Sequence, residues 1–222
     1  MSPKPSLRNR PRRGTKAVRA ADRLREAILR GELDTQAPLR EVELSRKLRI
    51  SRSPLREALH QLEGEGLVVL RPRRGAVVTR LSRAEVIEIA EICRLLEAHV
   101  LRLAVPNLTR EILGRAGDIV ERLDGISDPI EWSRLNWQLH SALYEPAERP
   151  RLVELVANLR RNGERYMYML LVDPRRRLSL NREHRSILGA CRGRRAKRAA
   201  ELLDAHLQGG KEKVLHLLEE MR

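Results

Sequence analysis

The apolar residues in the first third of the chain recur at helical spacing in three short segments. The first segment covers residues 17–30, and Gly31 directly after it is a typical helix terminator. The second covers residues 41–48. The third begins after Ser51, whose side chain is suited to capping a helix, and ends near Gly64. The pattern predicts three small helices in close succession.

A different pattern follows these helices. Residues 67–70 and 76–79 are apolar and mostly β-branched, and residues 71–75 between them contain Pro and Gly. Two such runs around a turn predict a β-hairpin. The predicted tip is basic, with Arg71, Arg73 and Arg74. Three helices followed by a basic-tipped hairpin predict a winged helix-turn-helix domain over residues 15–80.

Strand signals are absent after Ser82, and helical periodicity continues to the end of the chain. The Pro, Gly and Asn positions divide this part into six predicted helices: 83–104, 109–124, 128–145, 149–171, 176–191 and 194–220. Short connections favour antiparallel neighbours in a bundle. The expected fold is therefore mainly α, with an N-terminal winged helix-turn-helix and an all-α bundle over residues 83–222.

The composition adds a basic character to this picture. The chain has 45 Lys and Arg against 30 Asp and Glu, a formal net charge of +15. An excess of this size indicates a polyanionic partner, although an Arg-rich composition is also typical of GC-rich genomes. Residues 1–14 are rich in Pro, Arg and Lys and predict a disordered basic arm, which either contacts DNA or is only a solvated tail. Aromatic residues make up 2%, which argues against single-strand binding by base stacking.

Cysteine usage and hydropathy bear on the compartment. Cys93 and Cys191 both lie on apolar helical patterns and are expected to be reduced core residues. We find no apolar run of membrane-spanning length and no apolar signal core near the N-terminus. The chain is therefore expected to be cytoplasmic.

Polar residues gather at the start of the third predicted helix, opposite its apolar face. They are Ser51, Arg52, Ser53 and Arg56. The DNA major groove accommodates one helix, and Arg is the usual bidentate partner of guanine. Any one of these residues fits an ordinary solvated helix face equally well. Together with the helix-turn-helix pattern and the basic wing, they predict double-stranded DNA binding.

At this point the chain resembles the N-terminal domain of GntR-type regulators. The similar stretches are LREVELS from Leu39, ISRSPLREAL from Ile50, LEGEGLV from Leu62 and RGAVV from Arg74. The resemblance implies operator binding by Arg52 and Arg56, with Ser51 and Ser53 beside them, and wing contacts by Arg74 and Gly75. The family often has Arg where this chain has Val42. That contact is expected to be lost or taken over by Arg40 or Arg46.

Three histidines lie on inward faces of three different predicted helices: His140, His184 and His206. A shared divalent metal explains this arrangement better than three separate core histidines. Asn136 lies one helical turn before His140 and can reach the same point.

The spacing resembles the FCD sensor domain of the FadR branch of GntR regulators. That resemblance implies Asn136, His140, His184 and His206 as ligands of zinc, nickel or manganese. Many relatives have Asp in place of Asn136, and an amide is a weaker ligand for a divalent cation than a carboxylate.

The segment Arg94-Leu-Leu-Glu97 also resembles this family, which implies that Arg94 faces the pocket and binds the carboxylate of an effector. The residues alone fit an ion pair of Arg94 with Glu91 or Glu97 equally well. The implied effector is a small organic acid beside the metal. Tyr166, Tyr168 and Met169 are further candidates to line the cavity, and core packing explains them equally well.

These features predict a ligand-responsive transcriptional regulator that binds a palindromic operator as a homodimer, with repression as the default for the family. A metal-dependent hydrolase is the main alternative. It needs a positioned acid or base, and the sequence places no Glu or Asp beside the histidines. A nonspecific architectural DNA protein would not need an elaborate bundle with inward histidines. The chain is therefore not expected to be an enzyme.

Overall fold

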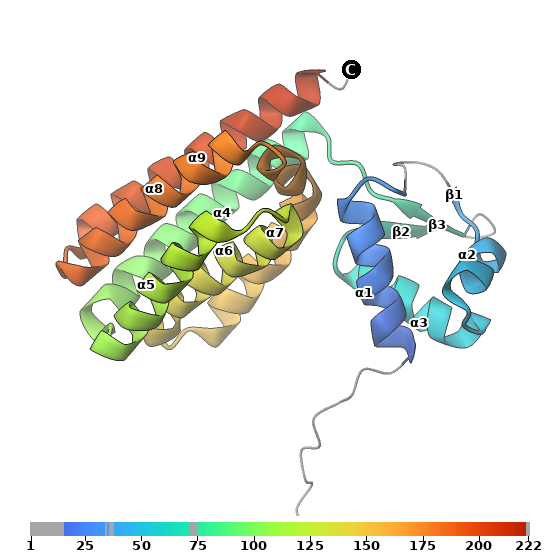
Figure 1. Cartoon of the computed structure of the whole chain (residues 1–222), viewed down its shortest axis with the longest axis horizontal. Helices are drawn as coiled ribbons and strands as arrows, with labels where there is room; N and C mark the ends of the chain where they lie inside the picture. The colour runs from blue at the N-terminus through green and yellow to red at the C-terminus, as the bar shows by residue number, and fades with distance from the viewer. Residues whose placement is uncertain (1–15, 34, 36–37, 72–74, 221–222) are drawn as a thin grey trace, which may run out of the picture.

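The computed structural model describes residues 16–33, 35, 38–71 and 75–220. They form two domains that lie side by side (Figure 1). We call the first the winged domain and the second, which begins at Arg83, the helical bundle. The predicted basic arm, residues 1–14, lies outside the described residues. The fold expected from the sequence is confirmed.

The winged domain begins with α1 (Lys16–Leu29), α2 (Glu41–Leu48) and α3 (Arg52–Gly64). Ser51 has the extended backbone of an N-cap, and Arg49 ends α2 in the left-handed conformation with φ 55°. The inner face of α3 is built from buried leucines, Leu55, Leu59 and Leu62. This face packs against α1 and leaves the opposite side of α3 in solvent.

The sheet of the winged domain is antiparallel, with strand order β1-β3-β2. Its strands are β1 (Pro38–Leu39), β2 (Val68–Arg71) and β3 (Gly75–Val78). The sequence predicted the hairpin of β2 and β3 but not β1. Two residues are too few for a periodic signal, and β1 exists only because β3 offers it an edge. Gly75 has φ 74°, and a Cβ there would lie 3.1 Å from the Leu39 carbonyl oxygen, so this close strand approach requires glycine.

The helical bundle consists of α4 (Arg83–Ala104), α5 (Arg110–Gly125), α6 (Pro129–Tyr144), α7 (Pro150–Leu171), α8 (Pro174–Arg192) and α9 (Ala196–Glu220). Short 3₁₀ turns follow α4 (Val105–Asn107) and α6 (Glu145–Ala147). Local caps explain several boundaries. Ser82 forms a capping box with Glu85, and the side chains of Asp128 and Asp173 cap helices that begin with Pro.

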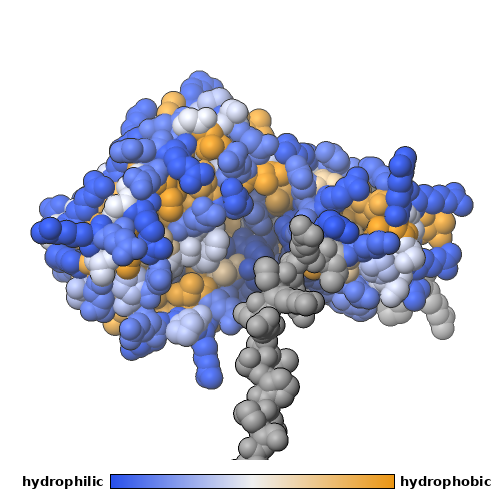
Figure 2. All heavy atoms as spheres, turned by 60° about the horizontal axis from the view of Figure 1, so that its bottom comes forward, coloured by the Kyte–Doolittle hydropathy of each residue, from blue (hydrophilic) through white to orange (hydrophobic). Residues whose placement is uncertain are grey.

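Each domain has its own apolar core, and the bundle core is centred on Trp132, Leu135 and Leu101. Cys93 and Cys191 are free and buried, as expected. The face of the molecule in Figure 2 is mostly hydrophilic, with hydrophobic side chains in small groups over both domains. Among the described helices, none has the length and hydropathy needed to cross a membrane.

The two domains touch through α7, the start of α6 and the segment that links β3 to α4. The backbone N–H of Leu81, in this linking segment, donates to the Tyr166 hydroxyl at 2.9 Å. Arg30 at the end of α1 donates to Asp128 at 2.9 Å. Gly66, with φ 72°, lies against the side chain of Asn162, which leaves no room for a Cβ. The part of α7 around Asn162 and Tyr166 therefore contacts both the winged domain and the linking segment.

Candidate functional sites

The outward face of α3 is polar and exposed. Ser51, Arg52 and Ser53 are all exposed at its first turn, where backbone N–H groups also point outward. Arg56 lies one turn further on, and its side chain is 63% exposed. The structure thus places together the four residues that the sequence assigned to DNA recognition on α3.

Carboxylates on α2 already hold some of these arginines. The Arg56 Nε donates to both oxygens of Glu41, at 3.0 and 3.1 Å, and Arg40 donates to Glu43 at 3.3 Å. Ion pairs in solvent contribute little free energy, so phosphate or guanine can replace Glu41 and Glu43 as partners. Arg74 lies outside the described residues, and Gly75 begins β3 beside them.

The three inward histidines meet inside the bundle. His140 comes from α6, His184 from α8 and His206 from α9, and one nitrogen of each lies within 4.8 Å of the others. The centroids of the His184 and His206 rings are 4.8 Å apart. The convergence expected from the sequence is therefore present. With Asn136 we call these residues the histidine centre.

Several polar atoms of this centre are buried without a hydrogen-bond partner. They are Oδ1 of Asn136, Nε2 of His140, and Nδ1 and Nε2 of His184. An unsatisfied buried polar atom costs about 1–3 kcal/mol, so such atoms are rare outside functional sites. Imidazole nitrogens and an amide oxygen are donors for a divalent cation. The residues present fit a metal ion, which would supply their missing partner.

Hydrogen bonds fix which nitrogen of two histidines faces the centre. The Tyr144 hydroxyl donates to Oε2 of Glu97 at 2.7 Å, so it accepts from Nδ1 of His140 at 3.1 Å. Nδ1 of His206 lies 2.6 Å from the Glu183 carboxyl, to which it donates. Both contacts leave Nε2 with a free lone pair. Partners of this kind orient metal-binding histidines in proteins.

The electrostatics of the centre favour neutral imidazoles. Burial, followed by the nearby charge of Arg160, lowers the pKa of His140 well below 6.5. Burial, followed by the neighbouring His206, lowers the pKa of His184 in the same direction. Burial also raises the pKa of the Cys93 thiol to about 12, so this thiol stays protonated. Neutral imidazole is the form that binds metal.

A cavity of about 130 Å³ adjoins the histidine centre. Asn136 and His206 form part of its wall, together with Glu97 and Arg160. Arg160 donates to Oε2 of Glu97 at 2.7 Å and lies over the Trp137 ring, 5.4 Å from its centroid. The guanidinium is thus a preoriented cation beside the centre. The cavity can hold a small anion between Arg160 and the histidines.

Two family models match the chain. The model of bacterial regulatory proteins of the gntR family matches residues 16–78, and the FCD domain model matches residues 88–209. The chain belongs to the GntR family of regulators. It is a DNA-binding transcriptional regulator with an FCD domain, and the families and relatives that it matches are transcriptional regulators rather than enzymes.

Individual relatives of this GntR regulator align with it over almost the whole chain. The HTH-type transcriptional repressor RspR of Escherichia coli is 28% identical over 204 residues, 89% of this chain and 88% of RspR. The HTH-type transcriptional regulator YdhC of Bacillus subtilis is 26% identical over 203 residues, 90% of this chain and 91% of YdhC. The domain order is therefore shared.

Solved structures give the same fold. Escherichia coli McbR/YncC superposes with a TM-score of 0.78 at 21% identity, over 92% of this chain and 99% of that one. A GntR family member from Pseudomonas syringae is 29% identical, with a TM-score of 0.54, over 93% of this chain and 87% of that one.

The structure of the GntR regulator places Arg94 away from the cavity. Its guanidinium donates to both carboxyl oxygens of Asp204 at 2.8 Å and to Gln208 at 2.5 Å. Arg94 is not among the residues that line the cavity, and its ion-pair partner is Asp204 rather than Glu91 or Glu97. The reason is helix phase. Cys93 and Glu97 lie on the inward face of α4, and Arg94 lies one position beside it.

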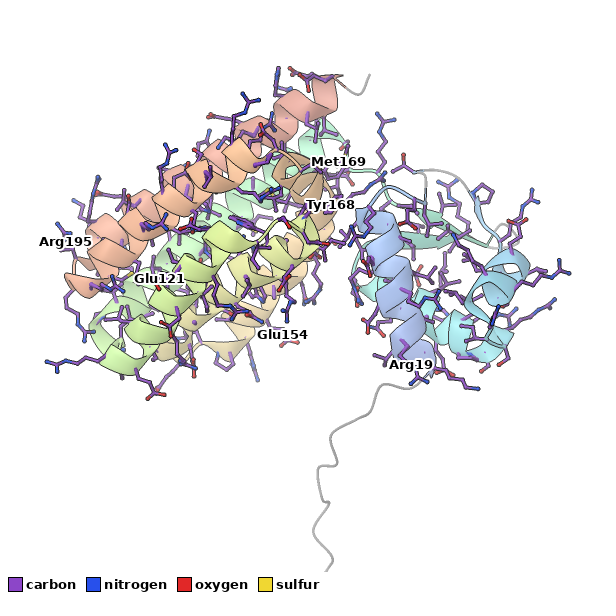
Figure 3. The ribbon with its side chains drawn as sticks, viewed as in Figure 1. Arg19, Glu121, Glu154, Tyr168, Met169 and Arg195 are labelled. Carbon is purple, nitrogen blue, oxygen red and sulfur yellow. The ribbon has the colours of Figure 1, made fainter. Side chains whose placement is uncertain are left out.

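The surroundings of the histidines and the wall of the cavity also differ from the expectation. Two acidic residues do lie beside the histidines, Glu97 and Glu183. Tyr166 lines the cavity, whereas Tyr168 and Met169 are not among its lining residues and lie at the end of α7 toward the winged domain (Figure 3). Arg160 is not among the residues predicted from the sequence. It lies four residues after the buried Val156, so its helical spacing could have identified it.

Proposed function

We propose that the GntR regulator is a ligand-responsive repressor, which binds a palindromic operator as a homodimer and is controlled by a small organic acid. The observation that supports this most is the convergence of unpartnered buried donors beside a cavity that Arg160 lines inside the bundle. A core without a ligand would leave these groups unsatisfied. In this proposal the protein acts on operator DNA in the cytoplasm.

The DNA-binding half of the proposal rests on α3. Arg52 and Arg56 contact base edges, Ser51 and Ser53 contact the backbone, and Arg40, directly before α2, supplies a further phosphate contact. Arg74 and Gly75 of the wing approach the adjacent groove. Regulators of this class bind two half-sites about one helical turn apart, which is why the proposal includes a homodimer and a palindrome.

The metal half rests on the histidine centre. Asn136, His140, His184 and His206 would hold zinc, nickel or manganese, and the metal would supply positive charge for an acidic ligand. Arg160 takes the carboxylate-binding role that the family resemblance gave to Arg94. The ligand lies against Tyr166, whose hydroxyl holds Leu81 of the linking segment. Ligand binding therefore changes how the linking segment holds the winged domain against the bundle. Operator affinity then shifts by as much as the ligand's affinity differs between the two arrangements of the domains.

A mobility-shift titration tests the proposal. Full-length protein is titrated into DNA from upstream of its own gene at physiological salt, with scrambled DNA of equal length as control. We expect affinity for one palindromic site that is at least about a thousandfold higher than for scrambled DNA. Equal affinities would contradict the operator. Analytical ultracentrifugation of the same sample checks the dimer.

A further inference from the structure

The cavity has a second, apolar part that the histidine centre and Arg160 do not use. Its walls come from α4, α7 and α9 and from the linking segment. The residues are Leu81, Val86, Ile89, Ala90, Met167, Leu207 and Val214. A ligand that used only the polar part would leave these side chains facing empty or poorly hydrated space.

Two glycines widen this cavity from opposite helices. Gly163 of α7 and Gly210 of α9 line it, and a Cβ added at either position would meet nothing within 4 Å. Both lie inside helices, where Gly is about 1 kcal/mol less favourable than Ala. Protein interiors are normally filled to close packing. Gly163 and Gly210 are half-buried, and the absence of side chains there leaves space beside the cavity that a ligand can occupy.

We propose that the effector is a compact monocarboxylic acid with an apolar body of about six carbon atoms. This inference rests on the proposed function and names the ligand class for that site. The carboxylate lies toward Arg160 and the histidine centre, and the apolar body lies against Val86, Ile89 and Val214. The whole cavity has about 130 Å³, slightly less than the apolar cavity of about 150 Å³ that accommodates benzene, so it limits the acid to a small body.

Polarity excludes acids that carry many hydroxyl or carboxyl groups. Such groups would lie against apolar walls without partners, at a cost of roughly 1–3 kcal/mol each. Lys211 is the further cation that lines the cavity. A dicarboxylic acid that reached Lys211 is the closest competitor, so the test includes one.

Calorimetric titration of full-length protein with one equivalent of zinc compares hexanoate and benzoate with gluconate, citrate and adipate. Adipate has the chain of hexanoate and a second carboxylate. We expect hexanoate and benzoate to bind at least about tenfold more tightly, which corresponds to about 1.4 kcal/mol. Tighter binding of gluconate, citrate or adipate would overturn the inference.

Neighbouring glycines supply matched variants. Gly210→Leu fills the apolar part and is expected to weaken hexanoate binding by at least about tenfold, while the melting temperature stays equal or rises. Gly209→Leu is the control, because Gly209 is also open at Cβ but does not line the cavity. It should leave hexanoate affinity within about twofold. Equal effects of the two variants would contradict the placement of the apolar body. If Gly210→Leu fails to fold, the ligand series on the unaltered protein still decides.

The outcomes separate this inference from the proposed function. If polar acids bind more tightly and change operator affinity, only the ligand class is wrong. If none of the five acids binds while the operator is still recognised, the inference fails together with the proposed response to an organic acid. If no operator is recognised but hexanoate binds, the proposed function fails while the ligand class stands.

Discussion

The DNA-binding face and the histidine centre both consist of polar side chains, but those of the first are exposed and those of the second are buried. Arg52, Ser53 and Arg56 lie in water, where a partner can reach them and Glu41 holds one of them only weakly. His140 and His184 lie in the core, where Nε2 of His140 and both ring nitrogens of His184 have no hydrogen-bond partner. Other charged side chains, such as those of Glu121, Glu154 and Arg195, extend from the outer faces of the bundle (Figure 3).

This difference predicts which mutations change only binding and which also change folding stability. A solvated arginine contributes little to folding, so its loss changes binding and leaves stability intact. A buried neutral histidine is tied to the fold, so its environment changes stability as well as metal binding.

The double variant Arg52→Ala/Arg56→Ala should lose about 2–6 kcal/mol of operator binding, because each base-contacting arginine is worth about 1–3 kcal/mol. Its melting temperature should stay unchanged. Mobility shift and calorimetry measure the two quantities. The control Arg102→Ala/Arg110→Ala removes the same charge from exposed positions of the bundle. If both double variants lose affinity equally, the effect is one of net charge and α3 is not the recognition helix.

Zinc at about 100 times its dissociation constant should stabilise the unaltered protein by about 2.7 kcal/mol, because it binds the folded state alone. His184→Gln should lose most of this gain, since both ring nitrogens of His184 lack other partners. Chemical denaturation with zinc or with a chelator measures the difference. His216→Gln, at an exposed position of α9, is the control and should keep the full gain.

A variant at Asn136 tests the same metal site through a gain of zinc affinity. Asn136→Asp replaces the amide with a carboxylate, which binds divalent cations better. Zinc affinity should rise by about tenfold, or about 1.4 kcal/mol. An unchanged affinity would place Asn136 outside the metal site.

Metal-free protein should lose stability as the pH falls below 6.5. The folded state holds the pKa of His140 and His184 well below 6.5, their value in the unfolded chain. The unfolded chain therefore binds more protons below pH 6.5, and the stability present above it is lost as the pH falls. The slope should approach about 1.4 kcal/mol per pH unit for each histidine. Urea unfolding with a chelator measures it, and His140→Gln/His184→Gln should flatten the slope.

The smallest effect concerns the contact between the domains. Arg30→Gln removes the ion pair with Asp128, and both side chains are partly exposed. Folding stability should change by less than about 1 kcal/mol. Operator affinity without ligand is the more sensitive measurement, because this pair orients the winged domain against the bundle. A loss of several kcal/mol in stability would show that the contact is part of a core rather than of a surface.

Much of the fold could be predicted from local patterns. The boundaries of α4 to α9 lie where Pro, Gly and capping residues interrupt helical periodicity, and α3 follows from Ser51 and its leucines. The convergence of His140, His184 and His206 was also predictable, because each lies on the apolar face of its own helix. Strand β1 could not be predicted, since a two-residue strand depends on the partner that pairs with it.

The sequence by itself determined the domains, the polar face of α3 and the inward histidines, because each depends on neighbours within about one or two helical turns. Only the tertiary structure decided that Arg160 rather than Arg94 faces the cavity, and that Glu97 and Glu183 orient two histidines. These outcomes depend on the rotation of one helix against another. Side-chain packing across the whole bundle sets that rotation, and it leaves no signal in a single segment.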